Sequence, residues 1–363
     1  MPTPAEVVVL PAHEGPLLIR EVTLPDPGPS QVVVKQFASG ICHSQLHQMN
    51  APRNAPTLLG HESTGVVIQK GADVTHVDEE DEVLVTWVPR NAAKDHSRPT
   101  AASLEIEGDT AISQNVFTWA THTIADQRFV VKTEPLEDRH STAIIGCAVM
   151  TGSGAVINTV DVQQGNSVAI FGVGGVGLSA IVAARIRGAN PIIAVDLDED
   201  KLTFAKQFGA THGINASKVD PVRSIHEMTV NPNELSIAGG PVSGVDYAFD
   251  CIGLKTTMEQ IVPSVRPGHF GARQGGTAVL VGVPHTTVEL RAGEILGTEK
   301  QFRGSIGGSC SPDRDFPVFL EWHRSGQLDL DSLVTKTYEL HDINEATSAL
   351  AEGRIAGRSI LRF

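Results

Sequence analysis

Hydrophobic residues follow two different patterns along this chain. Up to about residue 150 they form short strand-like runs at 6–10, 31–38, 63–69, 82–86 and 129–132, separated by prolines and glycines. This spacing predicts an irregular β-barrel. From about residue 150 to 305, apolar strands at 168–171, 192–195, 245–250 and 277–283 alternate with helical segments. Such alternation predicts an α/β fold, with a doubly wound parallel sheet covered by helices on both faces.

The last part of the chain has mixed elements. Its pattern of hydrophobic and polar residues predicts a helix at 315–325, a second helix at 343–352 and a closing strand at 358–363. Residues 88–108 are polar and poorly periodic, and predict a loop. With 363 residues, the chain is long enough for two domains that each bury their own core.

Charge and composition narrow the class of function. A formal net charge of −14 argues against nucleic-acid and acidic membrane partners, which need basic patches. The chain has no apolar run long enough for a spanning helix and no basic start typical of a secretory signal. Four cysteines fit a reducing cytoplasm better than a disulfide framework. We therefore expect a cytoplasmic protein whose partners are small molecules.

Three segments carry the residue types of a catalytic zinc site. Cys42 lies in the stretch 40–47 (GICHSQLH), His61 follows Gly60, and Cys147 follows Gly146. Two thiolates and one imidazole bind zinc tightly, and three protein ligands leave a fourth position for water or substrate. Taken singly, each residue is more often a packing residue. We expect the three side chains to converge on one zinc ion.

A glycine-rich motif marks a second site. Residues 172–177 (GVGGVG) stand between a buried strand and a helix, the context that a dinucleotide fingerprint requires. Gly172 allows the tight turn, Gly174 lets the backbone approach the pyrophosphate, and Gly177 lets helix and strand pack closely. The diphosphate would lie at the positive end of the helix.

Asp196, at the end of the next strand, bears on the choice of cofactor. Its carboxylate can accept hydrogen bonds from the adenosine ribose, but it would repel a 2′-phosphate. NAD is therefore expected rather than NADP. The alternative is that Asp196 is only an N-cap or turn residue in the acidic run 196–200.

With these motifs the chain resembles the zinc-dependent alcohol dehydrogenases of the medium-chain dehydrogenase/reductase superfamily, over nearly its whole length. The resemblance implies a discontinuous GroES-like catalytic domain, residues 1–150 and 306–363, and an NAD-binding Rossmann domain, residues 151–305. It implies Cys42, His61 and Cys147 as zinc ligands, with Glu62 as an occasional ligand. Relatives pair their nucleotide domains through a sheet edge, so a homodimer or homotetramer is expected, with that edge at 277–283.

The resemblance also implies roles for individual residues. Ser44 would contact the substrate oxygen, and His47 would end a proton relay to solvent. The implied cofactor contacts are His43 and Arg358 on the pyrophosphate, Lys201 on the adenosine ribose, Thr151 and Val176 against the nicotinamide, and Gly175 and Val281. Trp87 and Val283 would line the outer substrate pocket, where an indole suits apolar, allylic or aromatic alcohols, although a single tryptophan is equally often plain packing.

Two departures from the relatives stand out. Many relatives carry a second, structural zinc on four cysteines, but residues 89–115 contain no cysteine, so we expect one catalytic zinc per chain and no structural zinc. Gln45 stands where relatives carry an acidic residue that supports the zinc-binding histidine, so the metal's electronic environment is expected to differ.

The implied reaction is reversible oxidation of an alcohol to an aldehyde or ketone, with hydride passing to NAD. A polyol dehydrogenase or carbonyl reductase of the same superfamily is an alternative with the same fold and metal. A second alternative, from another class, is a non-catalytic protein that kept only nucleotide binding. The complete set of catalytic residue types argues against that alternative.

Overall fold

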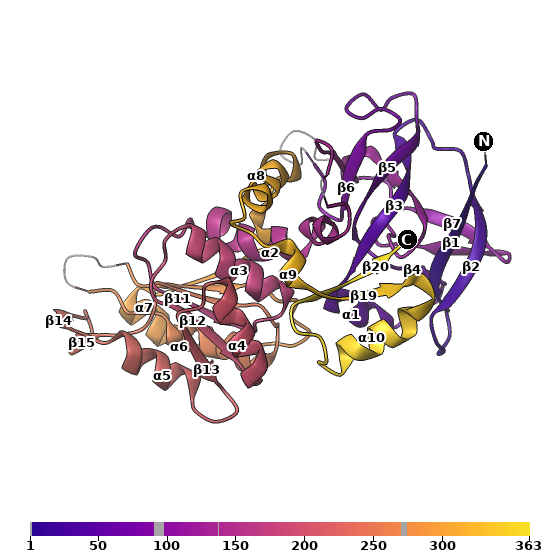
Figure 1. Cartoon of the computed structure of the whole chain (residues 1–363). Helices are drawn as coiled ribbons and strands as arrows, with labels where there is room; N and C mark the ends of the chain where they lie inside the picture. Colours follow the sequence, from indigo (N-terminus) through magenta and orange to yellow (C-terminus); the bar gives the residue numbers. More distant parts are fainter. Residues whose placement is uncertain (1, 91–97, 137, 270–273) are drawn as a thin grey trace. The chain divides into compact units, whose positions relative to one another are not determined.

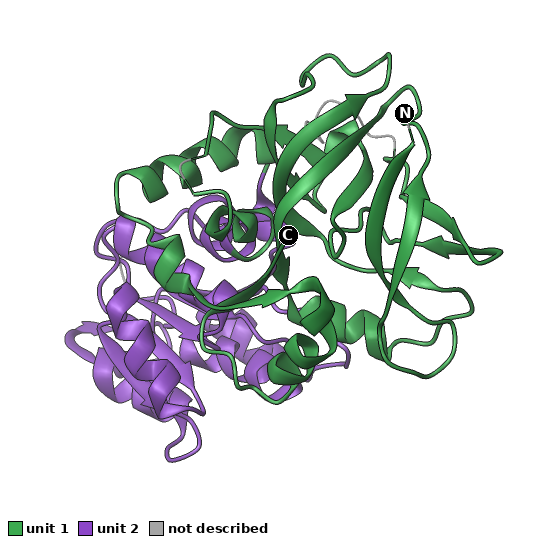
Figure 2. Cartoon of the chain, turned by 45° about the vertical axis from the view of Figure 1, so that its right-hand side comes forward, with its two compact units in different colours: residues 1–148, 311–363 green, residues 149–310 purple. Residues whose placement is uncertain are grey.

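The computed structural model describes residues 2–90, 98–136, 138–269 and 274–363, and the chain divides into two compact units (Figure 2). Unit 1 contains Met1–Ala148 and Ser311–Phe363, and unit 2 contains Val149–Cys310. The chain therefore leaves unit 1 after its first segment and returns to it with the second. Among the described residues, no helix is both long and apolar enough to cross a membrane.

Unit 1 consists mainly of two β-sheets (Figure 1), one ordered β2-β1-β4-β8-β7 and the other β10-β6-β5-β3-β20-β19, with β9 also paired to β3. Its strands are β1 (Thr3–Leu10), β2 (Leu18–Leu24), β3 (Gln31–Ile41), β4 (Thr57–Leu58), β5 (Glu62–Lys70), β6 (Glu82–Thr86), β7 (Ser103–Ile106), β8 (Asp109–Ile112), β9 (His122–Asp126), β10 (Val130–Lys132), β19 (Val334–Glu339) and β20 (Arg358–Arg362). Its helices are α1 (His43–Asn50), η1 (Gln127–Phe129), η2 (Ser141–Gly146), α8 (Pro312–Arg324), α9 (Leu330–Leu333), η5 (Leu340–Asp342) and α10 (Ile343–Ala351).

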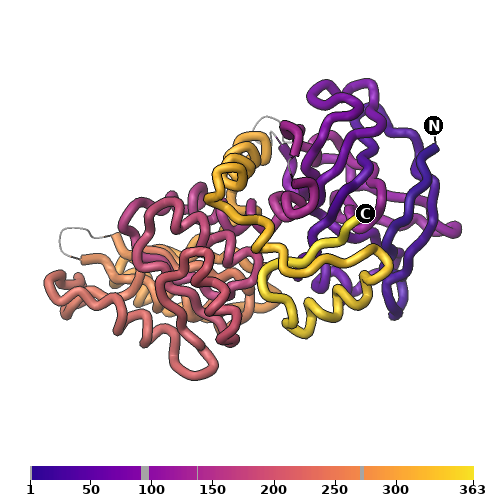
Figure 3. Tube along the Cα trace, viewed as in Figure 1, coloured from indigo at the N-terminus to yellow at the C-terminus, as the bar shows by residue number. Residues whose placement is uncertain are grey.

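Strand β3 is the centre of the larger sheet, because it pairs antiparallel with β5, β9 and β20. Figure 3 shows the yellow end of the chain running beside indigo β3. In this register Ser39 lies opposite Ser63 and Ile41 lies opposite Ser359. The end of β3 and the beginnings of β5 and β20 therefore meet at one place in unit 1.

Unit 2 contains a six-stranded sheet in the order β13-β12-β11-β16-β17-β18, in which every pairing is parallel. All four residues of β11 are buried, as expected for a strand covered on both faces. The predicted α/β fold with a parallel sheet is confirmed.

The helices and strands of unit 2 are as follows. They are α2 (Ala148–Gly154), which begins at the last residue of unit 1, η3 (Ala155–Thr159), β11 (Val168–Phe171), α3 (Gly175–Ile186), β12 (Ile192–Asp196), α4 (Glu199–Phe208), β13 (His212–Asn215), α5 (Pro221–Thr229), β14 (Asn231–Leu235), β15 (Pro241–Val242), β16 (Tyr247–Asp250), α6 (Lys255–Ser264), β17 (Thr277–Leu280), α7 (Ala292–Thr298), β18 (Gln301–Gly304) and η4 (Gly307–Ser309).

Two sequence-based expectations were wrong. Residues 277–283 do not form the edge of the sheet, because β17 is covered by β18, which pairs with it in parallel and takes the edge position. The predicted loop at 88–108 contains strand β7, which pairs with β8 as a hairpin. Residues 91–97 of that loop lie outside the described part of the chain.

Two glycines of unit 2 differ sharply in the space around them. A Cβ at Gly177 would overlap the carbonyl oxygen of Gly172, whereas a Cβ at Gly174 would meet no atom within 4 Å. Overpacking of this kind typically costs about 1–3 kcal/mol. We therefore expect Gly177→Ala to lower the free energy of unfolding by about 1–3 kcal/mol or more. Gly174→Ala should change it by less than about 0.5 kcal/mol. Denaturant unfolding measures both, and equal losses would contradict this account of the loop.

Candidate functional site

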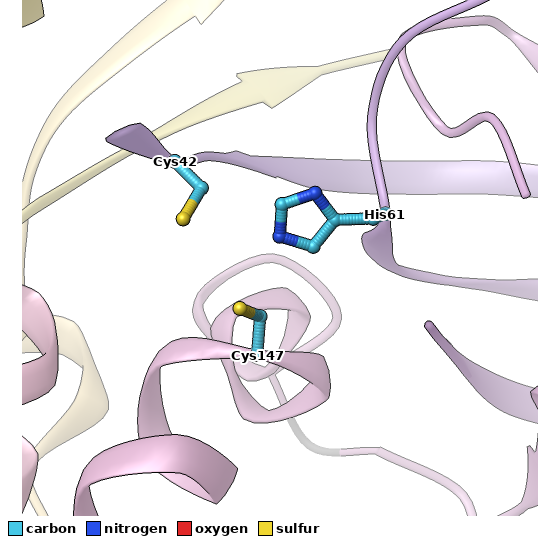
Figure 4. Close-up of side chains that lie close together, drawn as sticks. All are labelled: Cys42, His61 and Cys147. Carbon is cyan, nitrogen blue, oxygen red and sulfur yellow. The ribbon is translucent and has the colours of Figure 1, made fainter. Parts of the chain in front are cut away.

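The three candidate metal ligands come together inside unit 1. Cys42 follows β3 and precedes the first residue of α1, His61 precedes β5, and Cys147 follows η2. Their ligand atoms all lie within 4.8 Å of one another, and all three residues are buried. Figure 4 shows both sulfur atoms and the imidazole ring directed toward a common point. This donor set matches that of zinc sites with an open fourth position.

Two glycines beside the cysteines make room for Glu62. A Cβ at Gly40 would overlap the carboxylate of Glu62, and a Cβ at Gly146 would lie 2.6 Å from the Val85 carbonyl oxygen and 3.1 Å from Glu62 Cβ. Glu62 is fully buried as the first residue of β5. Positions 40 and 146 therefore need glycine for steric reasons, which the sequence motif alone does not reveal.

The Glu62 carboxylate is paired with Arg358, the first residue of β20. The guanidinium donates to Glu62 Oε1, and the backbone N–H of Ala148 donates to Oε2 at 3.2 Å. Burial raises the pKa of Glu62, although the charge of Arg358 opposes the shift. Burial alone would lower the pKa of Arg358, but the nearby Cys42 and Glu62 charges raise it, so the guanidinium stays charged. The sequence carries no sign of this pair, because 296 positions separate the partners and no local pattern connects them.

The surroundings of Cys42 favour its thiolate. The hydrogen bond with the Cys147 thiol lowers the pKa of Cys42 most, and the charges of Arg358 and His61 add to that effect against the opposing effect of burial. The same hydrogen bond, together with burial, raises the pKa of Cys147. A divalent cation would stabilise both thiolates.

Gln45 orients the imidazole of His61. Its side chain is almost fully buried in α1, and its Nε2 lies 2.8 Å from His61 Nδ1. Its Oε1 accepts a hydrogen bond from the backbone N–H of Gly60. For Nε2 to bind a metal ion, Nδ1 must carry the ring hydrogen, and the carboxamide oxygen of Gln45 rather than its nitrogen must then face Nδ1.

The other candidate residues of the 40–47 motif lie on α1. Ser44 is in the first turn, and among the described residues its buried Oγ has no hydrogen-bond partner. His47 lies three positions further along, on the same side of the helix. His43 is exposed at the helix start. A buried hydroxyl without a protein partner indicates a place where a ligand supplies the missing hydrogen bond.

The glycine-rich loop of unit 2 has the backbone of a nucleotide-binding turn. Gly172 has φ +86°, and α3 begins at Gly175. Asp196 is joined to this loop, because its Oδ2 accepts from the Val173 N–H at 3.0 Å. Its Oδ1 accepts from the N–H groups of Leu197 and Asp198, so Asp196 also stabilises the turn after β12. The cap of α4 is Asp198, whose side chain accepts from Asp200 and Lys201.

The remaining predicted residues are distributed over both units. In unit 1, Trp87 directly follows β6, and within the described structure its buried Nε1 has no hydrogen-bond partner. In unit 2, Thr151 is buried in α2, Val176 and Lys201 lie in the first turns of α3 and α4, Val281 is buried after β17, and Val283 is exposed.

Comparison with known proteins identifies matches for both units. The sequence profile described as "Alcohol dehydrogenase GroES-like domain" matches residues 28–135, and the profile described as "Zinc-binding dehydrogenase" matches residues 175–325. "Alcohol dehydrogenase class-3" of Cereibacter sphaeroides is 30% identical, over 96% of each chain. "S-(hydroxymethyl)glutathione dehydrogenase" of Paracoccus denitrificans is also 30% identical, over 93% of this chain and 94% of the relative.

Solved structures give the same result. The alcohol dehydrogenase zinc-binding domain protein of Burkholderia ambifaria is 30% identical, with a TM-score of 0.84 over 100% of both chains. The benzyl alcohol dehydrogenase of Acinetobacter calcoaceticus is 28% identical, with a TM-score of 0.85 over 99% of both chains. The likeness therefore extends over both units.

Replacing Glu62 and replacing Arg358 should lower the free energy of unfolding by different amounts. Glu62→Gln leaves the Arg358 charge without its carboxylate, and arginine cannot release its proton. We expect a loss of about 3–5 kcal/mol in the free energy of unfolding, as is typical when one partner of a buried pair is removed. Arg358→Met should cost less, because burial allows Glu62 to take up a proton and become neutral. Denaturant unfolding of metal-loaded protein measures both losses, and the reverse order would contradict the assignment.

Proposed function

The chain belongs to the zinc-dependent alcohol dehydrogenases of the medium-chain dehydrogenase/reductase superfamily, and we propose that it transfers hydride between an alcohol and NAD at a single catalytic zinc. The convergence of Cys42, His61 and Cys147 in unit 1 carries this proposal. Three ligands of this type leave a coordination position for substrate. The product of oxidation is an aldehyde or ketone.

The zinc would be bound by the Cys42 and Cys147 thiolates and by His61. When bound, zinc acts as a Lewis acid that lowers the pKa of an alcohol and polarises a carbonyl. The protein orients His61 through Gln45 and keeps the thiolates away from bulk water. Glu62 lies close enough to the cysteines to influence the metal, and Arg358 balances its charge.

The nucleotide would bind at the loop 172–177 of unit 2. NAD supplies the hydride acceptor. Gly174, where a side chain would find open space, leaves room for the diphosphate beside the start of α3. The Asp196 carboxylate retains lone pairs for the adenosine ribose and would repel a 2′-phosphate, which supports NAD over NADP. His43, Thr151, Gly175, Val176, Lys201, Val281 and Arg358 are proposed as further cofactor contacts.

The proton released by an alcohol would leave along α1. Ser44 accepts it first, because its buried hydroxyl lacks a partner within the described structure. His47, on the same side of the helix, passes it to solvent. In the direction of reduction, the same groups deliver a proton.

Apolar, allylic or aromatic alcohols are the proposed substrates. Trp87 and Val283 would form the pocket wall, and the similarity to a benzyl alcohol dehydrogenase supports an aromatic substrate. Initial rates of NAD reduction with aliphatic, allylic, benzylic and polyol substrates test the proposal. Preference for polyols would assign the chain to a different substrate class within the family.

Removal of one thiolate tests the metal assignment. We expect one zinc per chain to survive extensive dialysis of the wild-type protein and none to survive in Cys42→Ser, with loss of turnover. Unit 2 contains none of the three ligands, so Cys42→Ser should still bind NAD. Elemental analysis and NAD fluorescence titration are the measurements. If the Cys42→Ser variant still held zinc firmly, Cys42 would not be a ligand of that zinc.

Replacement of Asp196 tests the cofactor preference. Asp196→Ser removes ribose hydrogen bonds to a charged group, worth about 1.5–3 kcal/mol, so NAD affinity should fall roughly 10- to 100-fold. The loss of repulsion should raise the relative efficiency with NADP. Values of kcat/KM with both cofactors measure the change. Equal efficiency of the wild type with NAD and NADP would contradict the proposal.

The proton path is tested with two variants of α1. His47→Gln cannot accept a proton, so alcohol oxidation should slow several-fold at neutral pH and recover at high pH, where hydroxide replaces it. General acid–base contributions are typically about 10²–10⁴-fold, and a remote relay residue should be at the low end. Ser44→Ala should lose more activity, because Ser44 would touch the alcohol. A pH–rate profile of His47→Gln identical to wild type would remove His47 from the mechanism.

A further inference from the structure

A second group of metal-ligating side chains lies in unit 1, apart from the cysteines. Asp138 precedes η2, His323 is near the end of α8, and Asp331 is in α9. One ligand atom from each residue lies within 4.8 Å of the other two. Positions 138 and 323 are far apart in the sequence, so no local sequence pattern indicates this group.

The imidazole of His323 is held in one tautomer by the backbone. Its Nδ1 lies 3.1 Å from the Leu328 carbonyl oxygen. A carbonyl oxygen can only accept, so Nδ1 must carry the hydrogen. In the neutral ring, Nε2 is therefore the nitrogen that can bind a metal ion. A bond from the second ring nitrogen to a backbone carbonyl is the arrangement that usually orients metal-binding histidines.

Asp138 is held as a carboxylate by neighbouring donors. The backbone N–H groups of His140 and Ser141 each donate to it at 2.8 Å, and the Ser141 hydroxyl also donates. Burial opposes ionisation, but these hydrogen bonds outweigh it and hold the pKa of Asp138 below its usual value. Asp331 lies at hydrogen-bonding distance from Asp138. Two carboxylates this close repel each other unless a proton or a cation lies between them.

Other charged side chains lie near this group. Hydrogen bonds from Ser332 lower the pKa of Asp329, and His323 adds to that effect. Of the basic side chains adjacent in sequence, Arg139 pairs with Glu82 and Arg324 with Glu321. His140 Nδ1 lies 3.6 Å from Asp138 Oδ1. One metal-ligating atom from each of Asp138, His323 and Asp331 thus lies within reach of a single ion.

We propose that Asp138, His323 and Asp331 bind a second divalent transition-metal ion, of the Zn²⁺ type. One imidazole nitrogen and two carboxylate oxygens are ligands that zinc accepts, with weaker binding than two thiolates provide. The ion would connect α8 and α9 to the segment that leads through η2 to Cys147. With this ion, each chain would hold one firmly bound zinc at the cysteines and one exchangeable ion at this second site.

The experiment is a calorimetric titration of dialysed full-length protein, which retains its firmly held zinc, with ZnCl₂. Wild type should bind one further zinc ion per chain. Asp331→Asn alters an exposed residue, so the protein should fold normally and bind the added zinc roughly 100-fold more weakly or worse, since even outer-shell changes cost 10–100-fold. His323→Gln should behave in the same way. His341→Gln, which removes an exposed imidazole near Glu6, is the matched control and should bind like wild type.

Thermal unfolding provides a second readout. Excess zinc should raise the Tm of wild type and His341→Gln and leave that of Asp331→Asn unchanged, because only a ligand of the folded state stabilises it. Cys42→Ser should keep the additional binding event, which separates this proposal from the proposed catalytic site. Absence of further zinc binding by wild type would overturn the proposal. Unchanged zinc binding by Asp331→Asn would overturn it as well.

Discussion

The ion pair between Glu62 and Arg358 is the interaction on which the metal site of unit 1 depends. Glu62 lies between the two cysteine segments, and Gly40 and Gly146 lack side chains where its carboxylate and backbone need space. Burial of that carboxylate is unfavourable without a partner, and Arg358 supplies one from a strand that pairs with β3. The same guanidinium lowers the pKa of Cys42. The buried pair of Glu62 and Arg358 therefore links three features: the register of the sheet, the glycines at positions 40 and 146, and the thiolate of Cys42.

The second site in unit 2 depends mainly on backbone shape. Gly172 adopts a positive φ, Gly177 lets α3 approach β11, and Asp196 accepts a hydrogen bond from the loop itself. A carboxylate already fixed by backbone donors is preorganised, so little conformational entropy would be lost if it bound the ribose of the proposed cofactor. The loop and the acidic residue therefore act as one rigid element rather than as two independent contacts.

Local sequence patterns predicted much of this fold. The strands at 82–86 and 168–171 were predicted at their observed bounds, because turn residues enclose short apolar runs. Strand β7 was missed although its residues alternate between exposed and buried positions, because a four-residue run is the shortest that indicates a strand and it lies within a polar segment. The sheet edge was misplaced, because β18 is mostly exposed and has no apolar signature. Long-range partners such as Glu62 with Arg358, and Asp138 with His323, depend on tertiary folding and leave no local pattern.

The division of unit 1 into two segments has a consequence for the order of events during synthesis. The ribosome synthesises Cys42, His61 and Cys147 before unit 2, and it makes β20 only after unit 2 is finished. Domains generally fold as units while the chain grows, so unit 2 can form its sheet while unit 1 still lacks the strand beside β3. During that interval Glu62 has no guanidinium partner and Cys42 lacks the positive charge that stabilises its thiolate. The nascent chain can therefore carry a folded nucleotide domain well before it carries a mature metal centre.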